Sequence, residues 1–248
     1  EEEDSKHNHI TILMEYMTKG SLSSNINKSR SKINNTNRQI ILVGIAYGMK
    51  YLHDRNIIHR DLKPLNVHLD ENFFPHICDF GLLKMFKVDH KKEQSKWNGT
   101  IVYMAPEMFN GEEYDQKIYV YSFGILMYKV LTGLTPFPDF INGDVNFYKF
   151  GNLICNKTKL YRPKFEGDSL LIKKPIRDLT EKCWHPDPEF RPTFEEIFNL
   201  LSVFYNEDKK NANDYCLDDV DMNKLKDYLD KVTTIVNPVE EHMIKDFN

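Results

Sequence analysis

Apolar residues recur at helical spacing along much of the chain, and this pattern predicts most of its secondary structure. Between residues 35 and 55 apolar side chains cover nearly every helical face, which predicts a long helix buried on most sides. Asn35 and Thr36 are the candidate caps of this helix. Residues 119–131 form the longest apolar-rich run and predict a second core helix.

The second half of the chain holds three further predicted helices. Pro175 suits the first turn of a helix that runs to about Trp184. Thr193 and Glu196 form a capping-box pattern at the start of the next helix. Residues 217–236 can form an amphipathic helix, and the pattern leaves open whether it docks on this domain, on a neighbouring domain or on a separate partner.

Segments with a strand pattern are few and short. Residues 10–17 are rich in β-branched and long apolar side chains and predict one strand. Residues 67–69 and 76–78 predict a small β-hairpin, because turn-forming residues at 70–72 separate them. The chain is therefore expected to be mainly helical, with little sheet.

Charge and cysteine content narrow the functional classes. The chain has 33 Lys and Arg against 37 Asp and Glu, a balance that argues against a surface for nucleic acid or for an acidic membrane. Its four cysteines show neither a C-x-x-C pair nor a cluster with histidine, which is typical of free thiols in a reducing compartment such as the cytoplasm. Residues 119–131 are too few to span a bilayer and include Lys129, so no membrane span is expected.

Four motifs occur in order along the chain and carry its candidate chemistry. They are His-Arg-Asp-Leu-Lys-Pro-Leu-Asn at 59–66, Asp-Phe-Gly at 79–81, a run at 99–107 that ends in Ala-Pro-Glu, and a block at 183–194 that ends in Arg-Pro-Thr-Phe. The ordered set resembles the large lobe of eukaryotic protein kinases. Lys63 and the Cys-Trp and Arg-Pro-Thr-Phe residues of the last block resemble the tyrosine-kinase-like group of serine/threonine kinases.

The resemblance implies an α+β protein-kinase-like fold, of which this chain is mainly the α-helical large lobe with a short β-hairpin. Residues 1–19 would be a remnant of the small lobe with its last strand and the hinge. Residues 20–205 would be the large lobe, and residues 206–248 a linker and an amphipathic helical tail. The small lobe is expected to be largely missing, because no G-x-G-x-x-G loop and no Val-Ala-x-Lys strand precede Asp61.

The activity that the resemblance implies is phosphoryl transfer from Mg-ATP to a serine or threonine hydroxyl of a protein substrate. Asp61 would accept the proton of that hydroxyl, and Lys63 would place a cation beside the moving phosphoryl group. Asn66 and Asp79 would bind Mg²⁺ through hard oxygen atoms. A hairpin between them would return both side chains to one cleft.

Alignment with the family also places a nucleotide site and a structural ion pair. Met14, Glu15 and Met17 match the gatekeeper and the hinge that binds adenine, and His68 matches the residue beneath the adenine ring. Glu107 and Arg191 match a buried ion pair that ties the activation segment to a late helix. Both placements come from the resemblance alone.

The chain departs from the family pattern at two positions in the large lobe. Tyr119 stands where the family has an aspartate that accepts amide hydrogen bonds, and His68 replaces an apolar residue. These departures and the absent glycine-rich loop leave a second interpretation open, a pseudokinase or scaffold that binds partners without transferring phosphate. We expect no appreciable turnover from the isolated chain. Ser95 is the candidate phosphorylation acceptor in the segment after Asp79.

Overall fold

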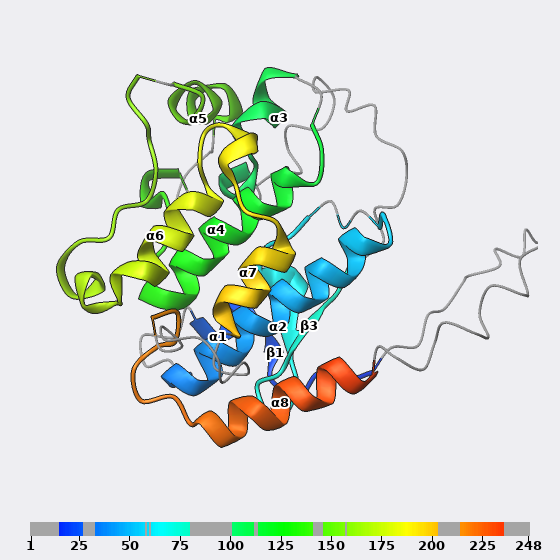
Figure 1. The fold of residues 1–248 in the computed structure, drawn as a ribbon. Coiled ribbons are helices and arrows are strands. Elements are labelled where there is room, and N and C mark those ends of the chain that lie inside the picture. The colour runs from blue at the N-terminus through cyan, green and yellow to red at the C-terminus, as the bar shows by residue number, and fades with distance from the viewer. Residues whose placement is uncertain are drawn as a thin grey trace, which may run out of the picture.

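The computed structural model describes residues 15–26, 33–57, 59, 61–79, 101–111, 114–140, 146–156, 158–202 and 214–235. They form a helical assembly that packs against one small sheet (Figure 1). The helices are α1 (Leu22–Ile26), α2 (Asn35–Asp54), α3 (Pro106–Asn110), α4 (Lys117–Thr132), α5 (Phe147–Ile154), α6 (Lys174–Cys183), α7 (Phe194–Leu201) and α8 (Met222–Ile235). The strands are β1 (Gly20–Ser21), β2 (Val67–Leu69) and β3 (Pro75–Ile77).

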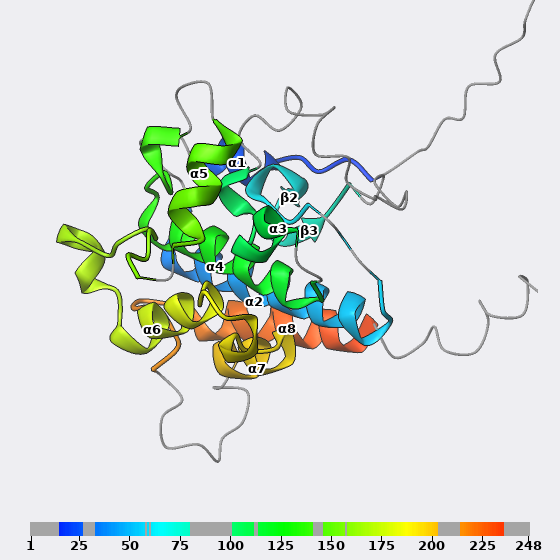
Figure 2. The same cartoon turned by 90° about the horizontal axis from the view of Figure 1, so that it is seen from above.

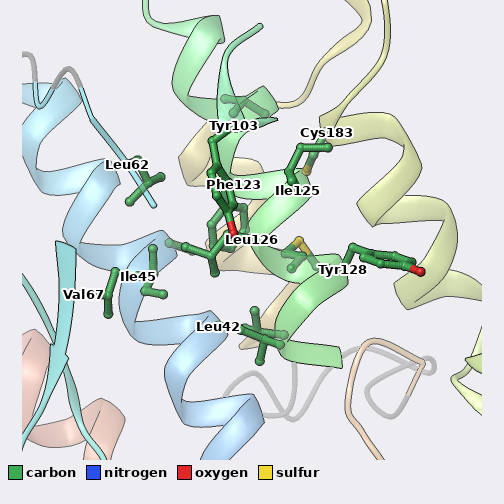
Figure 3. Close-up of a cluster of buried hydrophobic side chains, with 14 of the residues drawn as sticks. Leu42, Ile45, Leu62, Val67, Tyr103, Phe123, Ile125, Leu126, Tyr128 and Cys183 are labelled. Atoms are coloured by element: carbon green, nitrogen blue, oxygen red, sulfur yellow. The ribbon is translucent and has the colours of Figure 1, made fainter. Parts of the chain in front are cut away.

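Helices α2 and α4 form the centre of the core. Helix α2 lies between α4 and α8 in two perpendicular views (Figure 1, Figure 2) and also contacts α7 and β3. Figure 3 shows Leu42 and Ile45 of α2 together with Phe123 and Leu126 of α4 in this core. All four side chains are fully buried, so apolar burial holds the two longest helices together.

The sheet has the order β1-β2-β3, and both pairings are antiparallel. Val67 and Leu69 of β2 are buried, whereas His68 between them is only half-buried, because successive strand residues point to opposite faces. Asp70 fixes the turn of the β2–β3 hairpin, since its Oδ1 accepts the amides of Asn72 (2.8 Å) and Phe74 (2.9 Å). The predicted hairpin is confirmed, and its second strand begins one residue earlier than expected.

The predicted helices of the core are confirmed, with small shifts at their ends. The cap of α2 is Asn34 and not Asn35 or Thr36, because Asn34 Oδ1 accepts the amide of Asn37 at 2.9 Å. Thr36 instead accepts the amide of Asp221 through its hydroxyl (2.9 Å). Helix α7 begins with the predicted capping box of Thr193 and Glu196.

Two predicted boundaries are wrong. Residues 15–17 form no strand, although residues 10–14 of the predicted strand lie outside the described residues. The tail helix begins at Met222 and not at 217, because Leu217 donates its amide to Gln39 Oε1 (3.1 Å) and Asp219 has a left-handed backbone with φ of 56°. Asp221 then caps α8 by accepting the amides of the next turn at 3.1 Å. None of the described helices combines the length and apolar character needed to cross a bilayer.

His53, in the last turn of α2, couples the stability of this core to pH. Its ring packs edge-on against Phe194 at 5.0 Å and against Tyr119 at 5.7 Å. Among the residues that the structure describes, none forms a hydrogen bond with its Nε2. Burial lowers the pKa of His53 from 6.5 to about 4. Since the unfolded chain then takes up the proton first, the stabilisation is complete above pH 6.5 and is lost as the pH falls towards 4.

We expect the free energy of unfolding to fall by about 1 kcal/mol more in the native chain than in His53→Phe between pH 7.5 and pH 5, after allowing for partial exposure of the ring. Urea denaturation at the two pH values measures the difference. Phenylalanine keeps the contacts with the two rings, and the other histidines contribute equally to both proteins. Parallel pH profiles would contradict a neutral, buried His53.

Candidate active site

The side chains of Asp61, Lys63 and Asn66 form one hydrogen-bonded group. Lys63 Nζ lies 2.5 Å from Asp61 Oδ2, and Asn66 Nδ2 donates to the same oxygen at 3.0 Å. Asn66 Nδ2 also donates to the Asp61 carbonyl oxygen at 2.8 Å. The carboxylate of Asp61 is therefore held in one orientation by a cation and an amide.

Local backbone structure explains why these side chains meet. Pro64 starts the 3₁₀ turn Pro64–Asn66, where its fixed φ and missing N–H suit the first position. The main-chain N–H of Asn66 donates to the Lys63 carbonyl oxygen at 3.0 Å, and this bond turns the chain back towards Asp61. Leu62 and Val67, on either side of the turn at 63–66, are buried in the core (Figure 3), so the turn is anchored by apolar side chains at both ends.

The β2–β3 hairpin brings Asp79 back to the same place. The amide of Cys78 donates to the Asn66 carbonyl oxygen at 2.9 Å, which joins the two ends of the hairpin. Asp79 follows directly, with an exposed side chain and a left-handed backbone (φ of 69°) that is uncommon for a residue other than glycine. Such strain is concentrated at functional sites in proteins.

His59 lies at the centre of these groups. Its Nδ1 faces the amide of Asp61 at 3.4 Å, so its Nε2 carries the proton and donates to the Cys78 carbonyl oxygen at 2.9 Å. Burial lowers the pKa of His59, while the Cys78 carbonyl and the charges of Asp61 and Asp79 act in the opposite direction. The neutral imidazole thus links the Asp61 backbone to the end of the hairpin.

Met17, one of the residues predicted at the hinge, lies shortly before the first strand of the same sheet. Gly20 of β1 donates its main-chain amide to the Met17 carbonyl oxygen at 3.0 Å, and Ser21 pairs opposite His68. Met17 and His68 are half-buried, while Glu15 is exposed. Met14, Arg60, Phe80, Gly81 and Ser95 lie outside the described residues.

The donor set fits Mg²⁺. Asn66 Nδ2 is occupied by Asp61, which leaves the amide oxygen of Asn66 as the group that can bind a cation. Asp79 carries an exposed carboxylate one residue after Cys78, which is bonded to the Asn66 backbone. Mg²⁺ is commonly held by one or two carboxylates together with phosphate oxygens and water. The part of the chain that the structure describes contains no cluster of three or more His, Cys, Asp or Glu that could bind a metal without substrate.

The predicted ion pair between Glu107 and Arg191 is confirmed. Arg191 Nη1 and Nη2 lie 2.6 Å and 2.9 Å from the two carboxylate oxygens of Glu107, and both residues are buried. Arg191 Nε also donates to the His185 carbonyl oxygen at 2.8 Å. The pair joins α3, which follows the 3₁₀ turn Ile101–Tyr103, to the segment before α7.

Sequence reasoning missed two residues that support this ion pair. Lys117 donates to the Arg191 carbonyl oxygen, and the guanidinium carbon of Arg191 lies 5.3 Å from the ring centre of Tyr121. Tyr121 follows Tyr119 by two positions, but nothing in the apolar run distinguishes either ring from its neighbours.

Tyr119 itself is buried with its ring against His53, so a large aromatic side chain is accommodated where the family has aspartate.

We expect Glu107→Gln to lower the free energy of unfolding by about 3–5 kcal/mol, because it leaves the charge of Arg191 buried without a counter-ion. Urea denaturation measures the loss. Asp178→Asn is the matched control, since Asp178 forms an exposed pair with Lys174 at 2.5 Å whose removal should change stability by less than about 1 kcal/mol. Equal effects of the two substitutions would refute the structural role of the buried pair.

Comparisons with known proteins agree with this geometry. Residues 3–201 match the protein kinase domain family. The chain is 34% identical over 194 residues to a probable serine/threonine-protein kinase of Dictyostelium discoideum, covering 78% of this chain and 20% of that protein. It is 37% identical over 196 residues to the dual specificity protein kinase shkA of the same organism, covering 77% of this chain and 35% of that protein. A third relative, serine/threonine-protein kinase 12 of Arabidopsis thaliana, is 32% identical over 197 residues, covering 78% of this chain and 41% of that protein.

The chain thus spans between a fifth and two fifths of the length of these three relatives. The family match covers four of the elements described above that carry the site: the turn at 61–66, the β2–β3 hairpin, α3 and α7. The chain belongs to the protein kinase family.

Proposed function

We propose that this site takes part in phosphoryl transfer from Mg-ATP to a serine or threonine hydroxyl of a protein substrate. The observation that supports the proposal most directly is the group formed by Asp61, Lys63 and Asn66, with Lys63 Nζ and Asn66 Nδ2 both on Asp61 Oδ2. Phosphoryl transfer needs a positioned hydroxyl and charge neutralisation more than covalent help from the protein. A carboxylate fixed by a cation and an amide meets both needs.

Each residue of the group has a distinct role in the proposal. Asp61 orients the substrate hydroxyl and accepts its proton as the oxygen bonds to phosphorus. Lys63, 2.5 Å from that carboxylate, offsets negative charge at the transferred group. Asn66 orients Asp61 through its amide N–H and faces the metal with its amide oxygen. Mg-ATP, when bound, supplies the phosphoryl group and a cation that neutralises its oxygens.

The nucleotide would lie against the sheet edge formed by Met17 and His68. His68 belongs to the face of β2 opposite buried Val67 and Leu69, so its imidazole can stack on an adenine ring from the outer face of the sheet. Backbone groups near Glu15 and Met17 would bind the adenine edge. The polar ring of His68 predicts nucleotide binding that differs in strength from that of a site with an apolar residue at this position.

We also propose membership of the tyrosine-kinase-like group, with serine or threonine as the acceptor. The support is Lys63, two residues after Asp61, and the Cys183-Trp184 and Arg-Pro-Thr-Phe residues of the last motif. Some relatives are named dual specificity kinases. Transfer to tyrosine is therefore an outcome that a substrate assay must distinguish.

A scaffold without phosphoryl transfer is the second candidate. Its support is buried Tyr119 in place of aspartate, His68 beneath the expected adenine position, and the absence of a G-x-G-x-x-G loop from these 248 residues. The two candidates differ in one measurable property, phosphate transfer that depends on Asp61. They do not differ in partner binding, which both allow.

For these 248 residues alone we expect no Asp61-dependent transfer of labelled phosphate from Mg-ATP, because nothing in the sequence forms a glycine-rich cover for the phosphates. In the product of the whole reading frame we expect transfer that falls at least about 100-fold in Asp61→Asn. Glu181→Gln, an exposed carboxylate on α6, is the control and should leave the rate unchanged. A folded whole product that transfers no phosphate would favour the scaffold instead.

A further inference from the structure

The tail helix α8 lies beyond the residues that match the kinase family, yet it is joined to the core by buried polar contacts. Gln39 of α2 is fully buried and donates through Nε2 to the carbonyl oxygens of Leu201 (3.0 Å) and Tyr215 (3.2 Å). Its Oε1 accepts the amide of Leu217 at 3.1 Å. One side chain therefore ties the end of α7 and the start of the tail to α2.

Three further hydrogen bonds continue along the first turn of α2. Asn35 donates to the Asp218 carbonyl oxygen (3.0 Å), the Asp221 amide donates to Thr36 (2.9 Å), and Lys224 Nζ donates to Asn37 Oδ1 (3.0 Å). These contacts fix the register of α8 along α2, with which it lies side by side (Figure 1, Figure 2). The tail is docked in one defined position.

Further along α8, the tail reaches the β2–β3 hairpin. Tyr228 is buried (3% exposed), and its ring centre lies 4.7 Å from that of Phe74. Lys231 Nζ lies 5.6 Å from the centre of the Phe74 ring. Phe74 immediately precedes β3, so α8 contacts the hairpin at its turn.

Both the tail and the hairpin pack closely against one glycine of α2, Gly44. A Cβ atom at Gly44 would lie 2.1 Å from Tyr228 Oη and 2.5 Å from Pro75 Cγ. One turn later, a Cβ atom at Gly48 would lie 2.9 Å from Ile77 Cδ1. The strand β3 thus packs on a groove made by two glycines, and Tyr228 fills the same groove beside Pro75.

The hairpin needs such support because its strands have only three residues each. Isolated hairpins of this size are marginally stable in water, so their order depends on what they pack against. Asn66 directly precedes β2, and Asp79 comes two residues after β3. Any loosening of the hairpin therefore changes the distance between the two proposed magnesium ligands.

We propose that α8 is a positioning element of the active site, in which Tyr228 holds Phe74 and Pro75 on α2 and so keeps Asn66 and Asp79 in register. The expected effect of α8 on Mg-ATP binding rests on the proposed function. The expected effect of α8 on the order of the hairpin follows from packing alone and is independent of that function. Tyr228 and Phe74 act through the hairpin and touch no substrate.

Cys78 offers a built-in reporter of this coupling. It lies between β3 and Asp79, is half-buried, and its Sγ lies 3.4 Å from the His76 carbonyl oxygen. Because the folded hairpin covers part of this thiol, loosening of the hairpin should speed its modification. Cys155 caps the C-terminal end of α5 and is half-buried, and Cys183 is buried at the end of α6. These two thiols report on the part of the core outside the hairpin.

We expect Tyr228→Ala to raise the rate of Cys78 modification by a maleimide at least 10-fold, with Cys155 and Cys183 unchanged, when sites are mapped by mass spectrometry. Lys226→Ala on the exposed face of α8 is the matched control and should change no rate. If all thiols react faster in parallel, Tyr228 serves only global stability and the proposal fails. An unchanged Cys78 rate in folded Tyr228→Ala also overturns it.

Phe74→Leu provides a second variant should Tyr228→Ala not fold. Leucine keeps the turn apolar but removes both ring contacts, so we expect a selective rise of about 3-fold at Cys78; no selective rise overturns the proposal. In the whole reading-frame product, Tyr228→Ala should raise the KM for Mg-ATP with little change in kcat. A selective Cys78 response in a protein that transfers no phosphate would retain the positioning role and reject the kinase function alone.

Discussion

The hydrogen bond from the Cys78 amide to the Asn66 carbonyl oxygen is the contact on which the arrangement of the site depends. It closes the hairpin at the end where Asn66 and Asp79 lie, although both strands of the hairpin separate these two residues in sequence. On one side, Asn66 holds the carboxylate of Asp61 through its amide. On the other, His59 holds the Cys78 carbonyl oxygen. The Cys78–Asn66 bond therefore connects the Asn66 side chain and the Asp61 carboxylate on one side with the His59 ring on the other, and the Asp61 amide closes the circuit by donating to His59 Nδ1.

This site is polar, but apolar packing determines its position. Leu62 and Val67 insert into the core on either side of the turn at 63–66, and the alternation of β2 then directs His68 to the opposite face. A short turn between two buried anchors has little freedom, so the side chains of Lys63 and Asn66 meet Asp61 without a long-range contact of their own. These determinants all lie within residues 61–68, so the motif alone brings Asp61, Lys63 and Asn66 together. The contacts of Lys63 and Asn66 with Asp61 were not among the predictions from the sequence.

Contacts between distant residues were harder to infer. Gln39 interrupts the apolar pattern of α2, and the sequence does not reveal that its partners are Leu201, Tyr215 and Leu217. The same limit explains the misplaced cap, because Thr36 is committed to Asp221 and Asn34 takes the capping position. It also explains the misplaced start of the tail helix. In each case several residues could have served as the helix cap or helix start. A hydrogen-bond partner more than 150 positions away determined which of them does so.

The buried polar groups of α2 indicate that the folded unit includes the tail. Without residues 214–235, Gln39 would lose the Tyr215 carbonyl oxygen and the Leu217 amide, and Tyr228 would leave the groove at Gly44 open to water. Unsatisfied amide groups and exposed apolar surface are both costly. A kinase large lobe that ended at α7 would therefore expose a surface shaped for another helix. The fit between that surface and α8 argues that the tail belongs to the same folding unit. The hairpin, which contacts both α2 and α8, connects this packing to Asn66 and Asp79.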